Sequence, residues 1–501
     1  MRKRAWPAWV ASLVALSLLS SAPCTSGATT NPNRVLVVDK SFDLKTADPH
    51  LELSATSAML AKALYSTLLT FAAGDMSTPV PSLAESYSSS EDARRFTFKL
   101  RPHVAFSDGS PLTSADVVFS FDRLSKLKGP PSMMLAGVTA LAPDPSTVVL
   151  TSTDPNAAIP FIVANPAFAI VNSKLLGSGP YVLKSFSTFS DIELTANPRY
   201  GGPKPFYGRI VIRNMNAATQ LAYIASATDE VALDLSPAQA GTLTRDRSVV
   251  IKAVTSPDVV FLFANDNPLV STTTADKHFQ NAVRYALDYA LLVQLTGAGA
   301  IQATGEIPST MLGSLPAWTS PHRDVDRARA ELKASGIKNP TVSLGFASDL
   351  SVGGLPMSAL AAMVRSELGA AGITVNLAGA PAASATADYA AGGEQMGLWP
   401  VFATSADPNQ YLAFMPGRPI GIRAGWPAGA DASLESLGIQ ASTTPDLATR
   451  VQLFQLFQEQ LNQDGPFFPL VQPGRAIVAT RGITGLQFTP TWTIDIAAVA
   501  G

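Results

Sequence analysis

The sequence has few of the residues that build covalent cross-links, metal sites and strongly charged surfaces. Its 501 residues contain a single cysteine, Cys24, so no disulfide can form within the chain. The four histidines are scattered, and none has the spacing of metal ligands, so we predict no metal and no cofactor. Charged residues make up only 15%, and the formal net charge is -2. Such a balance gives no overall field that would attract nucleic acid or an anionic membrane surface.

Long apolar runs are also scarce, and the one that is present lies near the amino terminus. Three basic residues, Arg2 to Arg4, precede an apolar segment from Ala8 to Leu19, and small residues follow as far as Ala28. The apolar segment is shorter than the roughly 20 residues that a membrane-spanning helix needs. This order of basic, apolar and small regions is typical of an export signal, so we predict a signal peptide over residues 1–28.

The position of Cys24, directly after the apolar segment, leaves two processing routes open. A lipid on this cysteine would tether the exported protein to the outer face of the cytoplasmic membrane. The preceding Ser21-Ala22-Pro23, however, is a poor lipoprotein cleavage site. Cleavage after Ala28, with Ser26 two positions before it, fits the small-x-small rule better.

The rest of the chain alternates short strands with amphipathic helices and is rich enough in hydrophobic residues, at 47%, for a large core. The pattern changes at about Val259, and two such blocks imply two α/β lobes. In the first block we expect helices at 54–69 and after Thr113, and strands at 35–38, 96–100, 148–150, 181–183, 192–194 and 210–212. In the second block we expect helices at 277–295, 324–334, 360–370 and 449–461, and strands at 260–263, 342–346, 374–377 and 470–471.

A series of motifs, in the same order along some four hundred residues, resembles the bacterial extracellular solute-binding protein family 5. That family includes oligopeptide-, dipeptide- and nickel-binding receptors. The densest part of the match is LAESY at 83–87, FTFKLR at 96–101, FSDGSPLT at 106–113 and DVVFS at 116–120. Further matches are Asp48-Pro49-His50, GSGPY at 177–181, Asn265, VRYAL at 283–287, DRAR at 326–329 and GITV at 372–375.

The resemblance implies an α/β clamshell of the periplasmic-binding-protein type (type II, cluster C). On this basis 29–258 form the first lobe with an extra subdomain inserted at about 61–174, 259–474 form the second lobe, and 475–501 return to the first. The chain would be a monomeric, exported receptor on the periplasmic side of the envelope. It would capture a peptide or peptide-like solute by lobe closure and deliver it to the permease subunits of an ABC importer, without being an enzyme. It would meet the membrane only through a lipid on Cys24.

The resemblance also indicates where a ligand would bind. Peptide-binding members carry a Trp-x-x-Asp stretch in the second lobe, in which the carboxylate binds the peptide ammonium. Here Trp399 fits the aromatic position, but Phe402 stands where the carboxylate is expected, and Met396 replaces a frequent arginine. We therefore expect a ligand that needs no such charged anchor. The predicted ligand-binding residues are Trp399, Phe402, Asp407, Asn265, Tyr181, Ser54 and Ala55. Some of them have a structural alternative. Asp407 would then form a turn, Trp399 would occupy a core position, and Asn265 and Tyr181 would brace the backbone.

Three further classes of function are compatible with the sequence. A non-peptide solute, such as a metal chelate, haem or an oligosaccharide, would suit the same fold, and a receptor could serve signalling in place of uptake. A secreted serine hydrolase is a third class, because Ser125-x-x-Lys128 fits a motif of penicillin-recognising enzymes. The order of its companion motifs is wrong, since Ser107-Asp108-Gly109 precedes it and no Lys-Thr-Gly follows.

Overall fold

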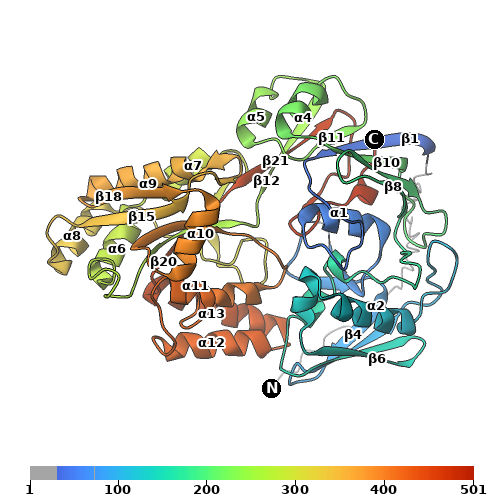
Figure 1. Cartoon of the computed structure of the whole chain (residues 1–501), viewed down its shortest axis with the longest axis horizontal. Coiled ribbons are helices and arrows are strands. Elements are labelled where there is room, and N and C mark those ends of the chain that lie inside the picture. The colour runs from blue at the N-terminus through green and yellow to red at the C-terminus, as the bar shows by residue number, and fades with distance from the viewer. Residues whose placement is uncertain (1–30, 73) are drawn as a thin grey trace, which may run out of the picture.

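The computed structural model describes residues 31–72 and 74–501, and it has two lobes side by side (Figure 1). The predicted signal peptide and Cys24 lie outside the described residues. None of the helices within the described ranges is long and apolar enough to cross a membrane.

The first lobe is built on a seven-stranded sheet in the order β12-β21-β11-β1-β10-β9-β8. The central strand β1 is parallel to β10 and β11, whereas the outer strands pair antiparallel. Leu36 and Val38 of β1 are fully buried and pack against Met59 and Leu60 of helix α1. The strands are β1 (Asn31–Lys40), β8 (Tyr181–Phe186), β9 (Asp191–Ala196), β10 (Tyr207–Asn214), β11 (Glu230–Ala232), β12 (Val249–Thr255) and β21 (Gly474–Thr480), and the helix is α1 (Ala55–Leu64).

A four-stranded antiparallel sheet in the order β4-β5-β7-β6 forms the smaller part of this lobe. In β5 the buried Phe96 and Phe98 alternate with more exposed residues, and helix α2 packs its apolar side against them through Val117. Thr113 and Asp116 form a capping box at the start of α2. The bounds are β4 (Ala84–Ser89), β5 (Arg95–Leu100), β6 (Val138–Asp144), β7 (Thr147–Ser152) and α2 (Ser114–Leu127).

The second lobe contains a six-stranded sheet in the order β14-β20-β13-β19-β15-β18. All six residues of β13 are buried, because the strand lies inside the sheet and helices cover both faces. Alternate residues of β13 therefore enter two different cores, Val260 and Leu262 on one face and Phe261 and Phe263 on the other. The strands are β13 (Val259–Ala264), β14 (Ile301–Gln302), β15 (Thr341–Ala347), β18 (Thr374–Ala380), β19 (Met396–Val401) and β20 (Phe467–Gln472).

The helices of the second lobe form two groups, one on each face of this sheet (Figure 1). The first group is α6 (Lys277–Ala286), α7 (Tyr289–Thr296), α8 (Val325–Ser335) and α9 (Met357–Ala371). The second group is α10 (Ala382–Ala391), α11 (Pro419–Arg423), α12 (Ala432–Thr443) and α13 (Leu447–Asp464). Shorter elements elsewhere are β2 (Leu69–Phe71), β3 (Pro79–Pro81), β16 (Ser351–Val352), β17 (Leu355–Pro356), β22 (Phe488–Thr489), β23 (Thr493–Ile494), α3 (Ile159–Ile162), α4 (Ala217–Ile224) and α5 (Pro237–Thr242).

The chain crosses between the two large sheets twice, from β12 to β13 and from β20 to β21 (Figure 1). The two crossings are tied together, because Ser256 donates its backbone N–H to the carbonyl of Pro473 at 2.8 Å, and β12 pairs with β21 along its full length. The predicted boundary at 258 lies in the first crossing, and the one at 474 lies at the first residue of β21. As the exact limits of the domains, they stay a prediction.

Two of the expected helices differ from those in the structure. The helix expected at 54–69 ends at Leu64, because Tyr65 is extended and Leu69 already belongs to β2. The single helix expected at 277–295 is two helices, α6 and α7. Leu287 is extended between them, and the side chain of Asp288 accepts the N–H of Leu291 and starts a new helix.

Candidate ligand site between the lobes

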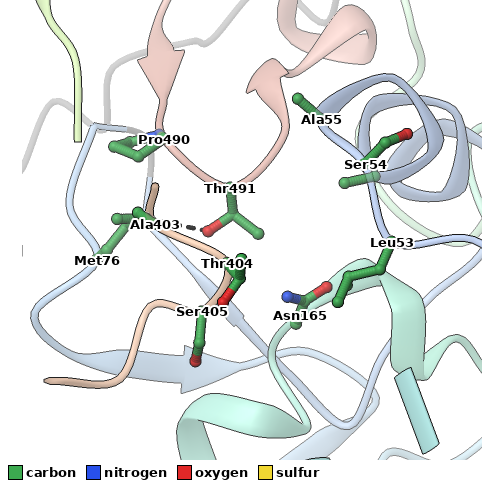
Figure 2. A pocket seen from close by; sticks show the side chains of 11 residues that line it. Leu53, Ser54, Ala55, Met76, Asn165, Ala403, Thr404, Ser405, Pro490 and Thr491 are labelled. Carbon is green, nitrogen blue, oxygen red and sulfur yellow. Dashed lines mark hydrogen bonds between the residues drawn. The ribbon is translucent and has the colours of Figure 1, made fainter. Parts of the chain in front are cut away.

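A pocket with about 510 Å³ of empty space lies between the two lobes. Figure 2 shows its walls. The first lobe contributes Leu53, Ser54, Ala55, Ala58, Met76, Asn165, Pro490 and Thr491, and the second lobe contributes Ala403, Thr404 and Ser405. Because both lobes form its walls, the pocket would open or close with any movement of one lobe against the other.

The start of helix α1 forms one wall of the pocket. Ser54 is the N-cap residue and accepts the N–H of Ser57 at 3.1 Å, while Ala55 is the first helical residue. Asn165 stands opposite in a short turn, where its Oδ1 accepts the N–H of Ala167 at 3.0 Å. Two of the predicted ligand-binding residues, Ser54 and Ala55, thus lie in the pocket wall.

The loop that follows β19 forms the second-lobe wall, and two side chains fix its shape. The Oε1 atom of Gln410 accepts the backbone N–H and the hydroxyl of Thr404 at 3.1 and 3.0 Å. Asp258, at the crossing between lobes, accepts the N–H of Ala403 at 3.4 Å and the guanidinium of Arg475 at 2.9 Å. The pocket loop is therefore connected directly to the interlobe strands.

Trp399 is only 6% exposed and is not among the residues that line the pocket. Its ring stacks on Tyr389 of α10 with centroids 4.6 Å apart, and its Nε1 donates to Glu394 at 2.9 Å. Burial raises the pKa of Glu394 to about 7. These contacts favour a core position for Trp399. Phe402, which is 49% exposed and immediately precedes Ala403, is not among the residues that line the pocket.

Asp407 is buried and forms a bidentate ion pair with Arg450 of α13, at 2.7 and 2.8 Å. Its Oδ1 atom also accepts the N–H of Asn409, which is the contact that a structural turn requires. Both carboxylate oxygens are occupied, so Asp407 has no free oxygen for a ligand. Arg450 also lies over the ring of Phe161 in the first lobe, with 5.4 Å to the centroid, and Ala157 donates to the carbonyl of Ser442 at 3.1 Å.

Asn265 and Tyr181 are buried away from the pocket and brace the backbone of their own lobes. The amide of Asn265 donates to the carbonyls of Gly392 and Glu394, and its Oδ1 accepts the N–H of Asn267. The hydroxyl of Tyr181 donates to the carbonyl of Tyr207 at 3.0 Å. These contacts favour backbone bracing over ligand contact for both residues.

Sequence reasoning missed most of the pocket wall. Thr404 and Ser405 were overlooked although they lie between a strand end and the Asp407-Pro408 turn, where a loop leaves the sheet edge. This position was the one available signal. Asn165, Pro490 and Thr491 gave none, because they come from segments far apart in the chain that only the fold brings together.

The residues that would serve a serine hydrolase or bind a metal chelate lie outside the pocket. Ser125 and Lys128 are exposed at the carboxyl end of α2. His50 is buried, with Nε2 2.9 Å from the carbonyl of Ala169 and Nδ1 2.9 Å from Arg123. In residues 31–72 and 74–501, no group of three or more histidine, cysteine or acidic side chains is placed to hold a metal ion.

Comparison with known proteins places this geometry in a family. The model of the bacterial extracellular solute-binding proteins, family 5 (middle region), matches residues 78–418. A probable D,D-dipeptide-binding periplasmic protein of Escherichia coli K12 is 26% identical over 504 residues, covering 96% of each chain. A glutathione-binding protein of Escherichia coli O6:K15:H31 is 26% identical over 516 residues, covering 95% of this chain and 96% of the relative.

A solved structure, HbpA2 from Haemophilus parasuis, has the same fold. Its TM-score is 0.83 at 20% sequence identity, with 93% of this chain and 99% of that chain covered. The two-lobed clamshell that the motifs implied is therefore confirmed. Because the family model covers more than half of the sequence, the chain belongs to the bacterial extracellular solute-binding proteins of family 5.

Proposed function

We propose that this protein captures a peptide or peptide-like solute in the pocket between its lobes and delivers it, unchanged, to the permease subunits of an ABC importer. The observation that carries the proposal is the pocket itself, whose walls come from both lobes and from the loop tied to the crossing strands. The names of the two relatives, which refer to D,D-dipeptides and glutathione, support a peptide-like ligand.

The same proposal includes the cellular setting. The basic, apolar and small regions of residues 1–28 support export to the periplasmic side of the envelope. The protein would work there as a monomer, either free or held by a lipid on Cys24. It would bind the solute and release it without changing it chemically. The pocket-lining residues include no histidine, cysteine or acidic side chain, which supports binding without turnover.

The test is to block the pocket and look for loss of a bound solute. Ala55 is exposed, is the first residue of α1 and lines the pocket, so Ala55→Phe places a ring in the pocket without disturbing a core. Mass spectrometry of what the purified protein releases on unfolding would identify the solute. We expect a small molecule from the parent protein and none from Ala55→Phe.

Ala432→Phe is the matched control, because Ala432 is also the exposed first residue of a helix, α12, and does not line this pocket. It should retain the solute. Adding the identified solute at roughly 100 times its dissociation constant should stabilise the parent by about 2.7 kcal/mol. Chemical conversion of the solute by the protein, or equal retention by both variants, would contradict the proposal.

A further inference from the structure

We infer that the ligand presents an uncharged, blocked amino end to this pocket, as an N-acylated peptide does, and that a free ammonium is disfavoured there. The inference rests on the proposed function and specifies its ligand class. The observation behind it is the chemistry of the pocket wall. None of the eleven residues that line the pocket carries a charge.

Two charged groups close to pocket-lining residues, Asp258 and Lys62, already have partners. Asp258 approaches through the N–H of Ala403, but its Oδ2 accepts from Arg475 at 2.9 Å and from the hydroxyl of Ser256 at 2.7 Å. Lys62, one turn after the pocket-lining Ala58 on α1, donates to Thr70 at 2.8 Å and lines a separate pocket within the first lobe. A ligand ammonium would find no carboxylate among the eleven residues that line the interlobe pocket.

The pocket does offer hydrogen-bond donors. Asn165 is only 3% exposed, and because its Oδ1 accepts from Ala167, the free group is the Nδ2 amide, which has no acceptor among the described residues. In Figure 2 this nitrogen points toward the loop of Thr404 and Ser405. The hydroxyl of Ser405 accepts the N–H of Asp407, and its own proton has no acceptor among the described residues. The amino end of helix α1 faces the same space and favours ligand oxygens over cations.

The pocket also offers acceptors, but only weak neutral ones. Thr404 donates its proton to Gln410, and Thr491 donates its proton to the sulfur of Met76 at 3.0 Å, so their remaining lone pairs are free (Figure 2). An acylated amino end presents one N–H and one carbonyl oxygen, which suits this mixture of donors and acceptors. An ammonium presents three donors and a full charge, and it would lose its water without gaining a counter-ion.

The apolar part of the wall favours an acylated peptide over a sugar. Leu53, Met76 and Pro490 provide apolar surface for an acyl group or a small side chain. The eleven lining residues include no aromatic ring, so the pocket lacks the flat surface on which a sugar ring stacks.

The test is a competition within one pool of tripeptides, in which every sequence is present both free and N-acetylated. The purified mature protein is incubated with the pool and separated by gel filtration, and the retained peptides are counted by mass spectrometry. We expect the acetylated forms to be enriched about tenfold or more, because an unpaired charged group loses a charge-assisted hydrogen bond. Enrichment of the free forms would overturn the inference and leave the proposed function standing. Retention of neither form would overturn both.

A matched pair of variants tests whether charge at the pocket decides the preference. Thr404→Asp places a carboxylate in the pocket wall and should shift retention toward the peptides with a free amine. Thr404→Asn introduces a neutral side chain of the same shape as aspartate and should keep the parent's preference. An unchanged preference in a folded Thr404→Asp protein would overturn the inference. If that variant does not fold, the enrichment measured with the parent still decides.

Discussion

Breaking the Arg450–Asp407 pair should be among the most destabilising single changes in the second lobe. We consider Arg450→Met, which keeps the length of the side chain and removes the guanidinium. Arg450 is fully buried, and its nitrogens also donate to the carbonyl of Ala441 and to Asn409, each at 2.9 Å. After the substitution, Asp407, whose side chain is 3% exposed, would lose both guanidinium donors and keep only the N–H of Asn409.

The expected cost follows from the carboxylate that is left behind. Removing one partner of a buried ion pair costs about 3–5 kcal/mol, because the remaining charge has neither water nor a counter-ion. The double variant Arg450→Met/Asp407→Asn removes both charges, and its asparagine can still accept the N–H of Asn409. We therefore expect the double variant to be more stable than Arg450→Met, with a coupling energy of about 2 kcal/mol between the two sites.

Chemical denaturation of the parent, the two single variants and the double variant gives all four free energies of unfolding. Circular dichroism reports the whole chain, and tryptophan fluorescence reports both lobes, through the buried Trp399 and Trp426 of the second lobe and Trp492 of the first. The reasoning is refuted if Arg450→Met costs less than about 1 kcal/mol or if the two substitutions are additive. Either result would mean that water or a rearranged neighbour replaces the guanidinium.

Two further predictions concern backbone fit and pH. Gly474→Ala should cost about 1–3 kcal/mol of unfolding free energy, because its Cβ would lie 2.0 Å from the carbonyl oxygen of Ala298. Gly369→Ala, in open space on α9, should instead stabilise the protein by about 0.5–1 kcal/mol. Equal effects of the two substitutions in denaturant titrations would contradict this. Burial raises the pKa of Glu306 from 4.5 to about 7, so the stability that its protonated form contributes is fully present below pH 4.5 and falls by about 3 kcal/mol as the pH rises to about 7. Glu306→Gln should therefore flatten the plot of unfolding free energy against pH by that amount. Identical plots for the parent and the variant would refute this.

Local signals in the sequence located part of the fold, including β5 and the long helices α2, α9 and α13. The capping residues Thr113 and Asp116 and the alternation of Phe96 and Phe98 act over a few residues, so they can be read without the tertiary structure. The break at Asp288 was missed because the apolar stripe continues across it, from Val283 to Leu292, and both helices bury that stripe in the same core. The aspartate itself was an available N-cap signal.

The candidate site was less predictable, because its chemistry depends on partners far away in the chain. Ser54 was found through the family resemblance, which brings the backbone after Asp48-Pro49-His50 to the ligand. By contrast, the role of Asp407 depends on Arg450, 43 residues later, and Asn165 reaches the pocket only through the packing of the first lobe. No periodicity or motif in the sequence records such pairings.

The contrast between Asp407 and Thr404 explains why residue type alone does not identify a ligand anchor. A carboxylate can bind a cationic ligand only if its oxygens are free, and the oxygens of Asp407 accept from a guanidinium and a backbone N–H. Three residues earlier, Thr404 faces the pocket and offers a single neutral oxygen. The charge of Asp407 is neutralised within the protein by Arg450, and recognition is left to hydrogen bonds and apolar contact. A pocket of this kind discriminates by shape and by matching donors to acceptors, and it gives a charged amino end no compensation for the water it would lose.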